Sequence, residues 1–332
     1  MFAIVPPVVG GPEVLTWAEV SDPSPNPDEV VIEVVAAGVN RADLLQRKGF
    51  YPPPPGASEI LGLECSGTIV EVGRDVRGWR IGESACALLA GGGYAQRVAV
   101  PAVQLLPVPR GVSVEDAAAL PEVACTAWSN LLMEGGLQRG QFVLVRGGTG
   151  GVGTHAIQIA RVLGAHVVAT VRNDAGSELC MRLGAAATAR FEDELHKVVS
   201  SATGGQGLDL ILDNLGGDFL QENVSLLKRG GRVVVIGLQK GVRGQLDLQA
   251  LMAKSAWIGS TNLRSRPSHG SGSKAEVVNA TRENVWPFLE DGSVVAVVHR
   301  KLPMSDAASA HRMLERGGVM GKIILLADQT VS

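Results

Sequence analysis

The sequence predicts an α/β protein of two domains, in which a doubly wound parallel-sheet domain interrupts a domain built mainly of β-strands. A chain of 332 residues exceeds what one hydrophobic core ordinarily supports. Its first third consists of short valine-rich segments between proline-dense loops, whereas continuous apolar segments alternate with helical patterns through the middle. These three observations set the fold class.

The strand-rich domain begins at the N-terminus. Segments 30–39, 66–73 and 95–101 are rich in valine and are typical of short strands. The loops between strands include SDPSPNPDE and YPPPPGA, whose prolines lack the N–H that a strand inside a sheet must donate. Such a run of strands predicts a small barrel-like domain, and we assign residues 1–120 to its first part.

The pattern changes near residue 121. Four continuous apolar segments are predicted strands: FVLVRGG, AHVVATV, LDLILDNLGG and GRVVVIGL. Helical segments such as THAIQIARVLG alternate with them, which is what a parallel sheet covered on both faces requires. We therefore predict a doubly wound domain over 121–264. Residues 265–332 begin with the Ser/Gly-rich loop RPSHGSGSK and are expected to return to the first domain through the closing strand GKIILL.

Charge and composition exclude several classes of function. The net charge of −3 gives no basic face for nucleic acid. The four cysteines contain no C-x-x-C pair, so we expect reduced thiols that pack as small apolar side chains. No run of 18 apolar residues is present, and the start MFAIVPPVVGGPEVL lacks the basic segment of a signal peptide. We therefore expect a cytoplasmic protein without a membrane segment.

The segment GTGGVG fits the G-x-G-x-x-G pattern of a dinucleotide-binding loop. It follows one predicted strand, opens a predicted helix and precedes a second strand over 166–171. Glycines there let the backbone turn tightly and approach a pyrophosphate, which binds the N–H groups of the helix N-terminus. The alternative is a structural turn without a ligand. The expected pyrophosphate contacts are Gly148, Gly150, Gly151, Val152 and Gly153.

The end of the strand over 166–171 indicates which dinucleotide binds. Enzymes that use NAD place Asp or Glu there, about 20 residues after the glycines, to bind the ribose 2′-OH. This chain has Arg172, whose guanidinium suits a 2′-phosphate, so the sequence favours NADPH. Asp174 follows closely enough to reach a ribose, and Arg172 is alternatively a solvated loop residue.

Several long motifs resemble the zinc-free quinone oxidoreductases of the zeta-crystallin type, in the medium-chain dehydrogenase/reductase superfamily. They are GVNRADLLQRKGFYPPPPGA, LGLECSG, GGYAQ, DAAALPEVACTAW, GGVGTHAIQIAR and GKIILL, and together they span essentially the whole chain. PPPGAS and the LRSR at 263–266 are most similar to the stress-induced NADPH:quinone oxidoreductase branch. The resemblance implies a GroES-like catalytic domain around a Rossmann domain.

The positions that hold catalytic zinc in alcohol dehydrogenases of that superfamily are matched by Asn40, Leu63 and Glu122. Leucine cannot ligate, and a catalytic zinc needs three ligands from imidazole, thiolate or carboxylate groups. We therefore predict no metal, and Cys65 is expected to be a small buried residue. Without a Lewis acid a simple ketone is a poor hydride acceptor, whereas a quinone or enone delocalises the added charge.

Polar side chains are expected to hold the acceptor where zinc would lie. Asn40 offers an amide and Tyr51 a phenol, while Asp43 would orient the loop or a ribose hydroxyl. The alternatives are a turn role for Asn40 and simple packing for Tyr51. The resemblance also implies that Thr126 lines the nicotinamide pocket with Asn40 and Tyr51.

Further cofactor contacts are expected at strand ends and on cationic side chains. Asn214 ends one predicted strand, and Gly237 and Leu238 end the next. Phe191 lies where related enzymes place a tyrosine against the adenosine. Arg264 and Lys322 are candidate phosphate partners, and the alternative for both is a plain surface role.

The leading functional hypothesis is an NADPH-dependent reductase that delivers hydride from nicotinamide C4 to a quinone. The second is an enone or 2-alkenal double-bond reductase. The third is a non-catalytic NADPH-binding protein, whose expected signature, a lost Asn40 or Tyr51, is not present. The resemblance also implies a homodimer. The segment SAWIGSTNL is predicted to be an exposed edge strand that would pair with its copy, unless the RPSHGSGSK loop masks that edge.

Overall fold

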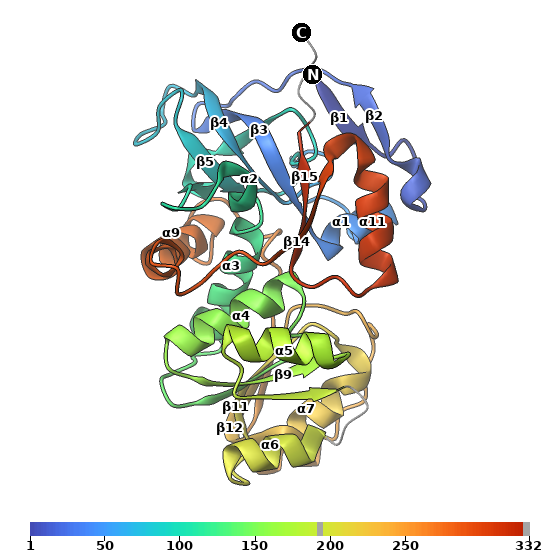
Figure 1. Ribbon diagram of the computed structural model, residues 1–332, viewed down its shortest axis with the longest axis vertical. Coiled ribbons are helices and arrows are strands. Elements are labelled where there is room, and N and C mark those ends of the chain that lie inside the picture. Colours follow the sequence, from blue (N-terminus) through green and yellow to red (C-terminus); the bar gives the residue numbers. More distant parts are fainter. Residues whose placement is uncertain (191–194, 328–332) are drawn as a thin grey trace. The chain divides into compact units, whose positions relative to one another are not determined.

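The computed structural model describes residues 1–190 and 195–327. The chain forms two compact units, which Figure 1 shows in sequence colours: unit 1 comprises residues 1–125 together with 263–332, and unit 2 comprises 126–262. The predicted boundaries after residues 120 and 264 differ from this division by a few positions at each junction. The chain leaves the first unit after residue 125, forms the second and re-enters the first at residue 263.

Unit 1 is built on a seven-stranded sheet of order β14-β15-β3-β4-β5-β7, with β6 also paired to β3. The closing strand β15 pairs antiparallel with β3, so the end of the chain lies in the sheet of unit 1. The strands of unit 1 are β1 (Phe2–Val5), β2 (Thr16–Glu19), β3 (Glu29–Val39), β4 (Glu64–Val72), β5 (Ser84–Leu88), β6 (Arg97–Pro101), β7 (Leu105–Pro107), β14 (Val298–Pro303) and β15 (Lys322–Leu326).

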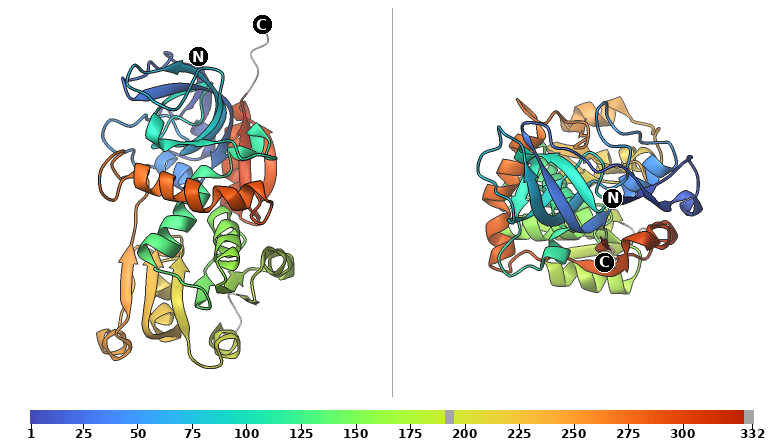
Figure 2. Two further views of the ribbon diagram at one scale, coloured as in Figure 1. Left: turned by 90° about the vertical axis from the view of Figure 1, so that its left-hand side faces the viewer. Right: turned by 90° about the horizontal axis from the view of Figure 1, so that it is seen from above.

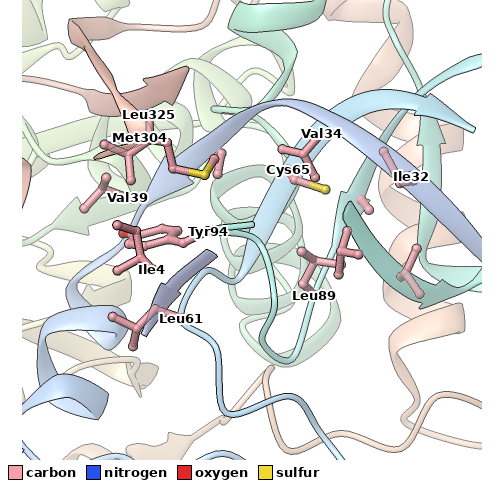
Figure 3. Packing of buried hydrophobic residues seen from close by; sticks show 14 of the residues in the cluster. Ile4, Ile32, Val34, Val39, Leu61, Cys65, Leu89, Tyr94, Met304 and Leu325 are labelled. Carbon is pink, nitrogen blue, oxygen red and sulfur yellow. The ribbon is translucent and has the colours of Figure 1, made fainter. Parts of the chain in front are cut away.

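The helices of unit 1 cover and connect these strands. They are α1 (Arg41–Arg47), α2 (Val114–Ala117), α9 (Lys274–Asn284), α10 (Trp286–Glu290) and α11 (Ala307–Arg316), while α3 (Pro121–Trp128) carries the chain into unit 2. Figure 3 shows part of the core, in which Cys65 and Tyr94 lie among aliphatic side chains. All four cysteines are buried and free, which confirms the prediction for the thiols.

Unit 2 contains a six-stranded sheet of order β10-β9-β8-β11-β12-β13, in which all pairings are parallel. Its strands are β8 (Phe142–Val145), β9 (His166–Val171), β10 (Ala187–Arg190), β11 (Leu208–Asp213), β12 (Leu227–Val235) and β13 (Trp257–Ser260). They lie side by side in Figure 2, with helices packed against them. The doubly wound fold that the continuous apolar strands predicted is confirmed.

The helices of unit 2 include α4 (Gly151–Val162), α5 (Asp174–Leu183), α6 (Leu195–Thr203), α7 (Leu220–Leu226) and α8 (Leu248–Lys254). Strand β13 is the last strand of the sheet, so the segment predicted as an edge strand does lie at an edge, and 68% of Trp257 is exposed. None of the described helices combines the length and apolar character needed to cross a membrane.

Candidate functional site

Three strand ends of unit 1 bring Asn40, Glu64 and Lys322 together. Strand β3 ends just before Asn40, whereas β4 begins at Glu64 and β15 at Lys322. Lys322 Nζ lies 2.6 Å from Glu64 Oε1, and it donates to Asn40 Oδ1 at 2.6 Å and to the Val39 carbonyl at 2.7 Å. The lysine and glutamate side chains are 4% and 0% exposed, so this ion pair is withdrawn from solvent.

The Glu64 carboxylate organises the surrounding backbone. Its Oε1 accepts a 2.8 Å hydrogen bond from Asn40 Nδ2, and its Oε2 accepts one of 2.9 Å from the backbone N–H of Glu122. Gly38 makes this approach possible, since a Cβ there would lie 2.4 Å from Glu64 Oε1 and 2.6 Å from the Ala118 carbonyl. The second N–H of the Asn40 amide donates to the Gly38 carbonyl at 3.3 Å.

This set of side chains does not fit a zinc ion. Leu63 is buried and presents only hydrocarbon, and the Asn40 oxygen and Glu64 Oε1 both face the Lys322 ammonium. A cation placed there would meet a fixed positive charge instead of a set of three ligands. Across the described residues, no group of three or more His, Cys, Asp or Glu side chains is placed to hold a metal ion.

Asp43 fastens the start of α1 to the neighbouring loop. Its fully buried carboxylate accepts hydrogen bonds from the backbone N–H of Asn40 at 2.7 Å, from Tyr94 Oη at 3.0 Å and from the Gly62 N–H at 3.2 Å. Burial raises the pKa of Asp43 to about 6, although these donors and the Lys322 charge oppose the rise. The Asp43 carboxylate therefore fixes the backbone at Asn40, just before α1, and at Gly62, two residues before Glu64.

The buried side chains of Tyr94, His311 and Arg47 form a chain of contacts that ends at Asp43. Burial, then the nearby Arg47 charge, lowers the pKa of His311 to about 3, so its imidazole is neutral. Arg47 Nη1 lies 3.2 Å from His311 Nδ1 and can only donate, which leaves the ring proton on Nε2. That nitrogen faces Tyr94 Oη at 3.3 Å, and Tyr94 in turn donates to Asp43. Sequence reasoning missed Tyr94 and His311, because no local pattern links them to Asp43.

Arg264 and Tyr51 form a further cluster in unit 1. The Arg264 guanidinium carbon lies 5.2 Å from the centre of the Tyr51 ring, and Nη1 donates to the Tyr51 carbonyl at 3.2 Å. Its other nitrogens donate to the Ala90 carbonyl at 2.8 Å and to Gln46 Oε1 at 2.6 Å. Only 3% of Arg264 is exposed, and Lys322 is equally buried, so neither has the surface position considered as the alternative.

Glu122 adds a proton-bearing carboxyl beside the Glu64 network. It is the second residue of α3 and is partly exposed. Burial first, then the negative charge of Glu64, raises the pKa of Glu122 to about 8, while Lys322 opposes the rise. At neutral pH the group is mainly protonated and therefore a hydrogen-bond donor. From the sequence it was considered only as an insufficient metal ligand.

The glycine loop of unit 2 forms a cradle before α4. Gly147 has φ +73°, and a Cβ on Gly153 would lie 2.3 Å from the Gly147 carbonyl, so the loop folds tightly onto the first helical turn. At Gly150 a Cβ would meet only the Gly147 carbonyl, at 3.6 Å, which leaves that face of the loop open. Gly150 is the N-cap of α4 and supplies no side-chain cap, so the first N–H groups of the helix suit an anion such as a pyrophosphate.

Asn214 lies against this cradle. A Cβ on Gly147 would be 2.8 Å from Asn214 Nδ2, and one on Gly237 would be 2.8 Å from the Asn214 carbonyl. Asn214 Oδ1 is buried, and the described residues offer it no hydrogen-bond partner. A buried acceptor without a donor is costly, so this atom fits a donor group of a bound cofactor. Leu238, the residue after Gly237, is 55% exposed.

The remaining predicted contacts lie elsewhere in unit 2. Arg172 follows the last residue of β9 and is exposed. Thr126 is 9% exposed, and its carbonyl accepts a 2.8 Å hydrogen bond from Asn130 Nδ2. Phe191 lies outside the described residues. The structure thus groups Gly148–Gly153 with Asn214 and Gly237, and it groups Asn40, Asp43 and Lys322 in unit 1.

Comparison with known proteins identifies the family. Residues 151–272 match the zinc-binding dehydrogenase family, and residues 26–110 match the alcohol dehydrogenase GroES-like domain. The chain is 31% identical over 327 residues to a phenolphthiocerol/phthiocerol polyketide synthase subunit of Mycobacterium tuberculosis, of which it spans only 14%.

Relatives of similar length cover nearly the whole chain. A quinone oxidoreductase of Rattus norvegicus is 31% identical over 96% of this chain and 95% of its own, and a 2-haloacrylate reductase of Burkholderia is 29% identical over 96% of both. The solved structure of Escherichia coli quinone oxidoreductase complexed with NADPH superposes with a TM-score of 0.88 at 27% identity, over 98% of this chain and 100% of that one. The chain therefore belongs to the medium-chain dehydrogenase/reductase superfamily, as an oxidoreductase related to the quinone oxidoreductases.

Proposed function

We propose that the protein is a zinc-independent, NADPH-dependent quinone oxidoreductase. The observation that carries this proposal is the buried Glu64–Lys322 pair, whose ammonium lies among the oxygens of Asn40 and Glu64. Because these side chains and Leu63 do not fit a Lewis-acid metal, the acceptor itself must be electrophilic. A quinone meets this requirement, since its ring delocalises the negative charge that it gains.

The side chains of unit 1 have distinct roles in this proposal. Tyr51 presents its phenol to a carbonyl of the acceptor, and the protonated Glu122 carboxyl is a second donor. Asn40 is a positioning residue and not a direct donor to the acceptor, because both N–H groups of its amide and its oxygen already bind protein groups. Asp43 holds the backbone of Asn40, and Lys322 holds Glu64 instead of binding a phosphate.

The side chains of unit 2 provide the cofactor contacts. When bound, NADPH supplies the hydride at C4 of its nicotinamide. The N–H groups of the glycine loop and of the first turn of α4 hold the pyrophosphate. Thr126, Asn214, Gly237 and Leu238 would line the nicotinamide side. Arg172 would bind the 2′-phosphate, which is the reason for preferring NADPH to NADH.

The decisive experiment follows oxidation of NADPH and of NADH with an ortho-quinone, a para-quinone and a 2-alkenal, in the presence of EDTA. We expect rapid oxidation of NADPH by the quinones, no effect of EDTA, and much slower oxidation of NADH. Inhibition by EDTA that added zinc reverses would contradict the proposal. Binding of NADPH without reduction of any acceptor would instead indicate a non-catalytic NADPH-binding protein.

A second candidate is an NADPH-dependent reductase of conjugated double bonds in enones or 2-alkenals. The similarity to a 2-haloacrylate reductase favours it, since the name of that relative specifies an activated double bond. The same site chemistry applies, because an enone also delocalises the added charge. Reduction of the 2-alkenal, with no oxidation of NADPH by either quinone, would select this candidate over the first.

We further propose that the protein forms a homodimer through the β13 edge. An unpaired strand edge exposes N–H and C=O groups that a second copy can satisfy. The apolar side chain of Trp257 on this strand is 68% exposed, and that of Met252 on the preceding helix α8 is 78% exposed.

A further inference from the structure

We propose that Arg190 is a second determinant of dinucleotide choice, which holds the Asp174 carboxylate and presents its guanidinium, with Arg172, to a 2′-phosphate. This inference rests on the proposed use of NADPH. The sequence alone indicates Arg172 as the ligand of the 2′-phosphate, with Asp174 as a competing ligand for a ribose hydroxyl.

The strand register brings the two arginines to one place. Strands β9 and β10 are parallel neighbours, and Arg190 is paired with Val171, the residue before Arg172. Neighbouring strands lie about 4.8 Å apart, so the two arginines leave adjacent strands at the same edge of the sheet. That edge is the carboxyl end of the strands, where doubly wound sheets bind their ligands, and β9 is the strand whose end receives the adenosine ribose.

Asp174 is not left alone at this edge. It is the first residue of α5, and its Oδ1 forms an ion pair with Arg190 Nη2. The side chains of Arg190 and Asp174 are 47% and 78% exposed, so both can be reached by a ligand. A carboxylate at this position ordinarily accepts a hydrogen bond from the ribose 2′-OH of NAD. Its pairing with a guanidinium weakens that preference.

The side chains at this edge also favour a phosphate. Arg172 and Arg190 supply two guanidinium groups at the ends of adjacent parallel strands, and both side chains are exposed. Arginine has five N–H donors, so one guanidinium can serve a carboxylate and a phosphate oxygen together. Exposed ion pairs such as Arg190–Asp174 contribute little, so a dianionic phosphate competes effectively for Arg190.

The test compares wild type with Arg190→Gln, Asp174→Asn and the double variant. Isothermal titration calorimetry measures the Kd of NADPH and NADH, and of 2′,5′-ADP and 5′-AMP, which differ in the phosphate alone. Arg190→Gln should weaken binding of NADPH and 2′,5′-ADP about tenfold, the value of one charge-assisted contact of roughly 1.4 kcal/mol. Binding of 5′-AMP should not weaken and should tighten, because the freed Asp174 carboxylate can then accept a hydrogen bond from the 2′-OH.

The double variant separates the two roles of Arg190. If Arg190 contacts the phosphate, Arg190→Gln still weakens 2′,5′-ADP when Asp174 is already Asn. If the effect disappears in that background, Arg190 acts only through Asp174 and the phosphate contact is wrong. Arg182→Gln, an exposed arginine in the last turn of α5, is the charge-matched control and should change Kd less than twofold.

Two results would overturn different conclusions. A wild-type protein that prefers NADH would contradict the proposed use of NADPH, whatever Arg190 does. A wild-type protein that prefers NADPH, with the same preference in Arg190→Gln, would overturn this inference alone. Circular dichroism of each variant checks that the fold is retained.

Discussion

At the scale of single residues, the pair of Lys322 and Glu64 is the most consequential contact of unit 1. Removing one member leaves a buried charge without its partner, which typically costs 3–5 kcal/mol. We therefore expect Lys322→Met to lower the free energy of unfolding by roughly that amount in urea denaturation. The matched control is Lys301→Met, because Lys301 pairs with Asp116 at the surface and its loss should cost less than about 1 kcal/mol.

The double variant Lys322→Met with Glu64→Gln tests the cause. It should be more stable than Lys322→Met alone, since the unpaired carboxylate is then also removed. Equal destabilisation by the Lys301 and Lys322 substitutions would contradict the importance assigned to burial of this pair.

Glu122 should make stability depend on pH. Its pKa is about 8 in the folded protein against 4.5 when unperturbed, so between these values the unfolded state loses the proton first. Stability therefore falls as pH rises through this window, because the unfolded state binds fewer protons. Glu122→Gln removes the titration, and its stability relative to wild type should increase by roughly 3 kcal/mol from pH 5 to pH 8.

Urea denaturation at pH 5, 6.5 and 8 measures this difference. Glu71→Gln, at an exposed position of β4, is the control and should track wild type at each pH. A constant difference between Glu122→Gln and wild type would show that the pKa of Glu122 is close to ordinary.

At the scale of elements, substitutions at different glycines of the loop before α4 should affect folding and NADPH binding to different extents. A Cβ on Gly150 meets only one atom, at 3.6 Å, whereas one on Gly153 would collide with the Gly147 carbonyl at 2.3 Å. Gly150→Ala should therefore keep the unfolding midpoint near that of wild type but weaken NADPH about tenfold or more, because the methyl group occupies the approach of the pyrophosphate.

Gly153→Ala should lower the unfolding midpoint as well, since the loop must move away from the helix. Calorimetric titration with NADPH and thermal melts of both variants provide the comparison. If Gly150→Ala binds NADPH as well as wild type, the pyrophosphate does not approach that face of the loop.

How much the sequence could predict also depends on the element. The parallel strands are continuous apolar runs and the cofactor loop is a contiguous motif, so local patterns predicted β8, α4 and β9. The site in unit 1 is different, because Glu64 and Lys322 come from opposite ends of the chain. The pairing of β3 with both β15 and β4 brings them together, and no periodicity encodes which charged side chain becomes buried there.

Because the sequence does not show which charged side chains become buried, it also suggested a phosphate-binding role for Lys322. A lysine at the start of a closing strand has no local feature that separates a surface position from a buried one. In the structure it is 3% exposed, and its ammonium faces Glu64, Asn40 and the Val39 carbonyl. Similarly, Asp174 was weighed from its position alone, whereas its ion pair with Arg190 depends on the register of β10.

At the scale of the whole molecule, the exposed edge of unit 2 should determine the oligomeric state. Wild type is expected to elute as a dimer in size-exclusion chromatography with light scattering. Trp257→Lys places a charge on β13 and should shift the population toward monomer while retaining the fold. Met181→Lys, at a 47% exposed apolar position on α5, is the control and should remain dimeric. A monomeric wild type would refute pairing through this edge.

The interruption of unit 1 has a consequence for the order in which the protein is made. Ribosomes release a chain from its N-terminus, so all of unit 2 emerges before β15. Unit 2 is contiguous and can fold during synthesis, whereas the sheet of unit 1 must wait for its last-made strands β14 and β15. Until then, Glu64 has no lysine partner and β3 lacks one neighbour. A folded unit 2 would shorten the loop that β15 must close, which lowers the entropic cost of completing unit 1.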